Sequence, residues 1–529
     1  MRLRPLIAAT ACLLACLPAL AQSGGGGGSS GGGGGDAASA EKIHARQDAE
    51  QIADHWTTAP VEETATSYDA RATVDGRTVN YTATAGTLTL RDAAGKPTAS
   101  IFYTAYTVPG SHRPLTFLYN GGPGSATLWL RMGSFAPERV LTTDPVAAAP
   151  APYPVIANPD TLIGTTDLVF LDAPGAGYSR ILGDAKPKDF YGVDQDVAAF
   201  TQAIKRYISK NERWGDPKYI FGESYGTTRS GALAESLEEA GVGLNGVMLL
   251  SSILNYGMRQ SGYDHIYQGY LPTYAAVAWY HNRVADRPAD LATFVQQARD
   301  FANGPYAAAL AKGSDISPQE VDAIAQQLSR FTGIAPDYVK QANLRIDLSR
   351  FRKELMRDQR LTVGRFDGRY TGVDADAAGE GPEFDASDTG ITGLYVSSFM
   401  DQLTRKFGYQ TDLDYRLSAS EAGDFDWDFS HRAPNQRYGK QGIADVTRDL
   451  STAMRTNPHL RVLSLNGYYD MATPFHNTER DLKHMMLPPE LGRNIQFTYY
   501  EAGHMVYLNP DALHQMRLDV QHFIEAGGR

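Results

Sequence analysis

Cysteine is almost absent from this chain: only Cys12 and Cys16 occur in 529 residues. Disulfide bonds and thiolate metal sites are therefore excluded from everything after residue 16. Clusters of Lys and Arg are missing too, and a net charge of -11 argues against a nucleic-acid surface. Past the N-terminus no apolar run reaches the roughly 18 residues of a membrane span, so we expect none in the mature chain.

Residues 1–21 predict an export signal. Arg2 and Arg4 precede an apolar stretch over residues 6–17, and Ala19-Leu20-Ala21 supplies a small-residue cleavage site. We therefore expect an exported protein, periplasmic or secreted, whose mature chain begins near Gln22 and has no cysteine. The alternative is a lipoprotein acylated at Cys16, because residues 13–16 resemble a lipoprotein box.

The rest of the chain divides into four predicted parts. Residues 22–40 are rich in Gly and Ser and predict a flexible linker. Residues 41–253 and 440–529 predict two parts of one α/β core, separated by an insertion at 254–439. The core opens with alternating polar and apolar residues over 64–108, interrupted by turns at Asp75-Gly76 and Ala94-Gly95, which predicts an antiparallel β meander.

Short apolar runs then alternate with helical periodicity, which is typical of a mostly parallel sheet flanked by helices. The predicted strands are residues 115–119, 168–171, 219–221, 247–250, 462–465 and 495–500. The predicted core helices are residues 192–208, 227–240 and a last helix through Leu513, Met516, Val520 and Phe523. Within the insertion we expect helices at residues 273–283, 290–302 and 318–328, forming a cap over the site.

The pentapeptide Gly222-Glu223-Ser224-Tyr225-Gly226 follows the apolar run 219–221 directly. Small residues at both ends allow a sharp turn from strand to helix, which exposes a serine hydroxyl above the sheet. The helix N-terminus beneath it favours developing negative charge. The pattern predicts a nucleophile elbow with Ser224 as the nucleophile.

Serine needs a base to take its proton, and the base needs a carboxylate to hold one tautomer. Asp470 and His504 each follow a predicted strand, and the chain order Ser, Asp, His is that of the α/β-hydrolases. His476 is the competing histidine and Glu501 the competing acid. An oxyanion also needs two backbone N–H donors, which we expect from Tyr225 and from the glycine loop after residues 115–119.

Four blocks, in this order and spacing, resemble the serine carboxypeptidase family. They span most of the chain from residue 115 to the end but leave out the meander and the cap. The blocks are Asn120-Gly121-Gly122-Pro123-Gly124, residues 172–179 (Asp-Ala-Pro-Gly-Ala-Gly-Tyr-Ser), the pentapeptide around Ser224, and Gly503-His504-Met505-Val506. The resemblance implies an α/β-hydrolase fold with Ser224, Asp470 and His504 as the catalytic triad.

The resemblance also implies residues for the oxyanion and for the substrate. The N–H groups of Gly122 and Tyr225 would form the oxyanion hole, while Asn120 and Glu223, assisted by the Gly121 backbone, would bind a free C-terminal carboxylate. Two carboxylates in contact repel unless they share a proton, so Glu223 must be protonated and binding should favour acidic pH.

The chain departs from the family pattern at several positions. Leu118 and Ser125 stand where relatives have Trp and Cys, and the position of a second family glutamate falls at Ser134. Asp374, Asp376, Gly379 and Asp385 partly imitate a calcium loop, but Ala378 breaks the pattern. We expect neither metal nor cofactor.

The predicted function is hydrolysis of the last peptide bond of peptides that have a free C-terminal carboxylate. Two alternatives keep the same fold: a serine esterase or acyltransferase, and a binding protein without catalysis. The oligomeric state and the side-chain specificity stay open.

Overall fold

The computed structural model describes residues 59–110, 112–260 and 262–527. The predicted export signal, the linker and Cys16 lie outside these ranges. None of the helices in the described ranges is long and apolar enough to cross a membrane.

The meander forms as predicted. Its strands are β1 (Ala65–Val74), β2 (Arg77–Arg91) and β3 (Pro97–Thr107), each antiparallel to the next. The turns fall at Asp75-Gly76 and before Pro97, and both Gly76 and Gly95 have positive φ. Because β3 also pairs with β7, the meander extends the central sheet rather than standing apart from it.

Within the described ranges the central sheet has ten strands: nine in the order β1-β2-β3-β7-β4-β9-β10-β13-β14, and β8, which pairs with β3. From β7 to β14 all neighbours are parallel. These strands match the six predicted apolar runs. Their bounds are β4 (Leu115–Tyr119), β7 (Asp167–Leu171), β9 (Lys218–Glu223), β10 (Gly246–Leu250), β13 (Arg461–Gly467) and β14 (Ile495–Tyr500). The short strand β8 (Arg180–Ile181) was not predicted and is antiparallel to β3.

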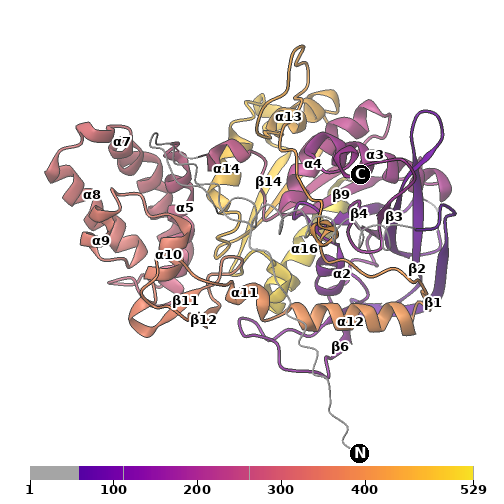
Figure 1. Ribbon diagram of the computed structural model, residues 1–529, viewed down its shortest axis with the longest axis horizontal. Helices are drawn as coiled ribbons and strands as arrows, with labels where there is room; N and C mark the ends of the chain where they lie inside the picture. Colours follow the sequence, from indigo (N-terminus) through magenta and orange to yellow (C-terminus); the bar gives the residue numbers. More distant parts are fainter. Residues whose placement is uncertain (1–58, 111, 261, 528–529) are drawn as a thin grey trace, which may run out of the picture. The chain divides into compact units, whose positions relative to one another are not determined.

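Helices lie on both sides of these strands in Figure 1. One group is α3 (Val193–Lys210), α4 (Tyr225–Glu239) and α13 (Thr447–Thr456); the other is α2 (Leu128–Gly133), α12 (Thr392–Arg405) and α16 (Pro510–Gly527). The remaining core elements are α14 (Phe475–Lys483), α15 (Pro489–Gly492) and the small sheet of β5 (Glu138–Val140) and β6 (Val155–Ala157).

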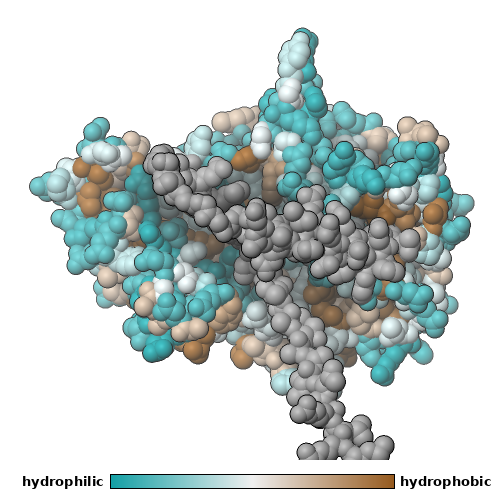
Figure 2. All heavy atoms as spheres, in the orientation of Figure 1, coloured by the Kyte–Doolittle hydropathy of each residue, from teal (hydrophilic) through white to brown (hydrophobic). Residues whose placement is uncertain are grey.

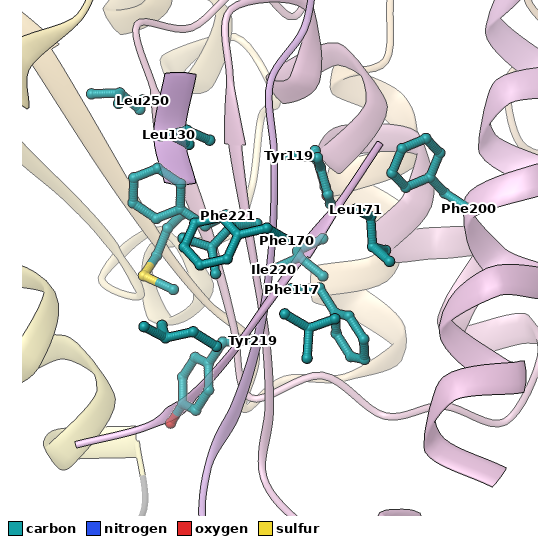
Figure 3. Close-up of a cluster of buried hydrophobic side chains, with 14 of the residues drawn as sticks. Phe117, Tyr119, Leu130, Phe170, Leu171, Phe200, Tyr219, Ile220, Phe221 and Leu250 are labelled. Carbon is teal, nitrogen blue, oxygen red and sulfur yellow. The ribbon is translucent and has the colours of Figure 1, made fainter. Parts of the chain in front are cut away.

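The buried strands pack their two faces against different helices, because side chains alternate along a strand. Tyr119 contacts Phe200 of α3, whereas Tyr219 contacts Phe523 of α16. Figure 3 shows this alternation along β9, with Tyr219 and Phe221 on one side and Ile220 on the other. The sheet is therefore covered on both faces, and its strands end in loops that share one edge.

The insertion is largely helical at first. Its elements are α5 (His265–Tyr280), α6 (Leu291–Phe301), α7 (Ala307–Leu310), α8 (Pro318–Thr332), α9 (Pro336–Gln341), α10 (Leu348–Glu354), β11 (Leu361–Val363), β12 (Thr371–Val373) and α11 (Ala386–Thr389). Helix α5 begins eight residues before the predicted start at residue 273 and contains Pro272. The outer surface of α7 to α9 is mainly hydrophilic in Figure 2.

Two parts of the insertion pack differently. Apolar side chains between residues 270 and 363 form a cluster of their own, joined by Tyr469, Met471 and Phe475 of the core. Apolar side chains of residues 391–419, among them those of α12, belong to the cluster around the sheet. The domain boundaries at residues 253 and 439 stay predictions.

Candidate active site

Ser224 lies between β9 and α4, where the chain turns from strand to helix. Its backbone has φ 59° and ψ -129°, a strained combination for a residue with a side chain. The turn also needs small residues, because a Cβ at Gly222 would lie 2.2 Å from the Gly226 carbonyl oxygen. Ser224 is partly exposed whereas its neighbours Glu223 and Tyr225 are buried. The geometry is that of a nucleophile elbow.

The glycine loop after β4 lies directly against this elbow. A Cβ added to Gly121 would come within 2.4 Å of the Tyr225 amide nitrogen, so only glycine fits there. Within the described ranges, neither the Gly122 N–H nor the Tyr225 N–H donates to another backbone group. The two N–H groups predicted as oxyanion donors are thus not used in backbone hydrogen bonds among the described residues.

The structure brings His504 and Asp470 together. His504 Nδ1 lies 2.9 Å from Asp470 Oδ2, and both side chains are almost fully buried. The other oxygen, Oδ1, accepts hydrogen bonds from the Ala472 and Thr473 amides at 2.8 and 2.9 Å. These backbone donors fix the orientation of the carboxylate, which can hold the histidine in one tautomer.

Ser224 follows β9 and His504 follows β14, and the end of β10, which lies between these strands in the sheet, contacts both residues. The Ser224 amide donates to the Leu250 carbonyl at 3.0 Å, and Ser251 Oγ donates to the His504 carbonyl at 2.6 Å. Among the described residues no hydrogen bond joins the Ser224 and His504 side chains. Such bonds often form only in the substrate complex.

Asn120 and Glu223 meet beside the nucleophile. Asn120 Nδ2 donates to Glu223 Oε2 at 2.9 Å, and both side chains are buried. Burial raises the pKa of Glu223 to about 7, although the positive charge of His504 and hydrogen bonds from Tyr507 and Asn120 act to lower it. A carboxyl group in this state can hold a proton near neutral pH and share it with an incoming carboxylate.

Sequence reasoning missed two residues of this region. Thr473 Oγ1 lies 2.6 Å from Asp470 Oδ2 and 3.1 Å from His504 Nδ1, so it bridges the acid and the base. The Tyr507 hydroxyl lies 2.9 Å from Glu223 Oε2 and 3.2 Å from Oε1. Thr473 lies three residues after Asp470 and Tyr507 three residues after His504, so closeness in sequence to the predicted triad is the one signal that could have indicated them.

A buried ion pair joins α4, the helix that follows the elbow, to α3. Arg229 of α4 contacts Asp196 of α3 at 2.7 Å, and both side chains are almost completely buried. The same guanidinium donates to the Asn120 carbonyl at 2.9 Å. One arginine therefore ties the elbow helix, its neighbouring helix and the glycine loop together.

A segment of the insertion, residues 365–369, lies on the loops that carry the base and the acid. The His504 amide donates to the Phe366 carbonyl at 2.6 Å, and the Phe366 ring lies 5.1 Å from the imidazole. Met471 N donates to the Arg365 carbonyl at 3.1 Å. Arg369 fixes the end of this segment through buried contacts with Asp144 and Asp367.

The competing residues lie elsewhere. His476 Nδ1 contacts Glu479 at 3.0 Å, and Arg299 of α6 donates to the same carboxylate. Burial alone would raise the pKa of Glu479, but hydrogen bonds from His476 and Arg299 lower it to about 2. This group joins the insertion to α14. Glu501 is exposed and lies 3.5 Å from the Tyr469 hydroxyl.

No group of His, Cys, Asp and Glu in the described ranges is arranged to hold a metal ion. At the partial calcium motif, the Lys353 ammonium contacts the Asp374 carboxylate and the Asp376 carbonyl. The Lys353 side chain thus contacts Asp374 and Asp376, two of the four residues of the motif.

Known proteins resemble this chain in sequence and in fold. The model of the serine carboxypeptidase family matches residues 75–508. Among solved structures, Kex1(ΔP), a prohormone-processing carboxypeptidase from Saccharomyces cerevisiae, has 14% identity and a TM-score of 0.51, covering 84% of this chain and 91% of its own. A proline iminopeptidase from Mycobacterium smegmatis has 14% identity and a TM-score of 0.34, covering 83% and 98%. No curated protein sequence matches. The predicted α/β-hydrolase fold is confirmed.

Proposed function

The chain belongs to the serine carboxypeptidase family, and on that premise we propose that it removes the C-terminal residue of peptides through an acyl-enzyme on Ser224. One observation carries the proposal: Glu223, which directly precedes the nucleophile, is buried and hydrogen-bonded to Asn120. A buried carboxyl group with a raised pKa suits the binding of a free carboxylate at this point, and an enzyme acting only on esters has no need of it.

The proposed chemistry follows the residues in order. His504 takes the proton of the Ser224 hydroxyl while Oγ bonds to the carbonyl carbon of the last peptide bond. The carbonyl oxygen becomes an oxyanion held by the Gly122 and Tyr225 N–H groups. The C–N bond then breaks, and His504 gives its proton to the leaving amine, which releases the terminal amino acid.

A second half-reaction restores the enzyme. Water enters, His504 takes one of its protons, and the oxygen attacks the acyl carbon. The bond to Ser224 Oγ breaks, the proton returns to Oγ, and the shortened peptide leaves. Asp470 holds the imidazole in place through Nδ1 in both half-reactions.

We propose that Asn120, Gly121 and Glu223 select substrates that have a free C-terminal carboxylate. The Asn120 amide and the Gly121 N–H would donate to the substrate carboxylate, and protonated Glu223 would share its proton with it. Glu223 loses that proton as pH rises through about 7. We therefore expect kcat/KM for free-acid peptides to fall over that range.

Three measurements test the function. Ser224→Ala should abolish release of the terminal residue, and the wild-type protein should cleave a free-acid peptide at least ~100-fold better than its C-terminal amide, because the amide leaves buried polar groups unpaired. Equal rates on acid and amide, with preference for small esters, would identify an esterase or acyltransferase. Failure of a fluorophosphonate to label Ser224 would identify a binding protein without catalysis.

We also propose export, on the evidence of residues 1–21. Fractionation of producing cells should place the protein in the periplasm or the medium. Retention in the membrane that depends on Cys16 would identify a lipoprotein instead.

A further inference from the structure

Among the described residues, Tyr507 is the one whose side chain lies within hydrogen-bond distance of both oxygens of Glu223. It lies in the short turn Val506–Leu508 after His504, and its side chain is completely buried. Its hydroxyl is 2.9 Å from Oε2, the oxygen that also accepts from Asn120, and 3.2 Å from Oε1. Oε1 therefore has the weaker protein contact and is the oxygen left to carry a proton.

Ser134 does not supply a partner for this carboxyl group. Its hydroxyl is buried and donates to the Leu130 carbonyl of its own helix at 2.6 Å. The sequence resemblance puts a second glutamate at this position, so Glu223 has no neighbouring carboxyl group from α2. The hydrogen bond comes instead from the phenol of Tyr507, which is far from α2 in sequence.

The ring of Tyr507 is fixed by close packing. A Cβ at Gly133 would lie 2.4 Å from Tyr507 Cδ2 and 2.6 Å from the Tyr395 hydroxyl. The Tyr395 hydroxyl is buried as well, but it has no hydrogen-bond partner within the described ranges. Two tyrosines thus lie against the same glycine, and only one of them reaches Glu223.

We propose that Tyr507 is a positioning residue of the carboxylate pocket, whose hydroxyl orients Glu223 and sets the pH at which this carboxyl group releases its proton. The inference rests on the proposed function, since it assigns how the pocket for the substrate's chain end works. A phenol can donate to Glu223 but carries no charge itself at neutral pH, so it holds the carboxyl group without competing with the substrate for a shared proton.

The electrostatics give the direction of the effect. The titratable groups that face Glu223 are Tyr507, Tyr395, His504 and Asp470. Burial raises the pKa of Glu223 to about 7, and the hydrogen bond from Tyr507 lowers it from a still higher value. Removing that donor disfavours the carboxylate form, so Glu223 should keep its proton to higher pH.

The test is the pH profile of kcat/KM for a free-acid peptide and for an ester without a free carboxylate. Tyr507→Phe should move the alkaline fall with the peptide upward by about one pH unit, since a hydrogen bond to a charged group has about that effect. It should leave the ester profile in place, which also reports that the variant is folded. An unchanged or downward-shifted fall in Tyr507→Phe overturns the inference.

Two further variants separate the inference from the function on which it rests. Tyr395→Phe removes a buried phenol oxygen beside the same glycine and should not move either profile; an equal shift in both tyrosine variants overturns the inference. Glu223→Gln should abolish the alkaline fall with the peptide. If it does and Tyr507→Phe has no effect, only the inference fails, whereas a peptide that is cleaved no better than its amide contradicts the proposed function itself.

Discussion

Ser224 is held by the sheet and its own helices, whereas His504 is held by a segment of the insertion. The elbow depends on contacts among β9, α3, α4 and the glycine loop, with Arg229 at their centre. The histidine loop depends on residues 365–369, which are more than a hundred residues away in sequence. Ser224 is thus supported by the α/β core, and His504 by a segment of the insertion.

The largest expected effect is the loss of kcat on removal of His504, compared with removal of His476, the other histidine that contacts a carboxylate. His504→Ala should lower kcat about 10⁴-fold or more, because the nucleophile loses its base. His476→Ala should leave kcat within a few-fold and lower stability by about 1–3 kcal/mol, since Glu479 loses a buried hydrogen bond. Steady-state kinetics and urea unfolding of both variants check this. A large loss of kcat in His476→Ala would show that the join between α6 and α14 also places the site.

Breaking the support of the elbow should have the next largest effect. Arg229→Met leaves the buried Asp196 without its partner, which should destabilise the fold by about 3–5 kcal/mol. The matched control is Arg206→Met, because Arg206 pairs with Glu63 at 2.7 Å but is 47% exposed. Such a surface pair contributes about 1 kcal/mol or less. Equal losses of unfolding free energy in the two variants would contradict the role assigned to Arg229.

The smallest expected effect comes from Phe366, whose ring lies beside His504. Phe366→Ala keeps the backbone bond to His504 but removes the ring, and an aromatic contact is worth about 0.5–1.5 kcal/mol. We expect kcat/KM to fall about 2- to 10-fold on peptides and esters alike, because the histidine serves both reactions. Phe366→Leu, which restores apolar bulk, should recover part of the loss. A loss confined to peptides would place Phe366 in substrate binding instead.

Local patterns were sufficient to predict the core. The turn at Ser224, the alternation in β1 to β3 and the apolar runs of the parallel strands all depend on residues close together in sequence. The pairing of His504 with Asp470 followed from the chain order of the motifs. Where a proline interrupted the pattern, as at Pro272, the predicted helix began too late.

Contacts between distant residues were not predictable in the same way. The bond between Tyr507 and Glu223 spans 284 positions, and no periodicity relates the two. The amphipathic helix α12 was not predicted, because it follows an acidic, Gly-rich stretch, and its apolar face packs with the sheet. The path of residues 365–369 over the catalytic loops likewise depends on tertiary packing alone.

The bond from the His504 amide to the Phe366 carbonyl constrains how this enzyme can be re-engineered. A minimal hydrolase cannot be made by excising the insertion and joining its ends, because the deletion removes the hydrogen-bond acceptor against which the histidine loop is seated. Nor can the insertion swing aside as a rigid lid without pulling that loop along. We therefore expect a graft from a relative to keep the histidine loop in place when it carries residues 365–369 unchanged.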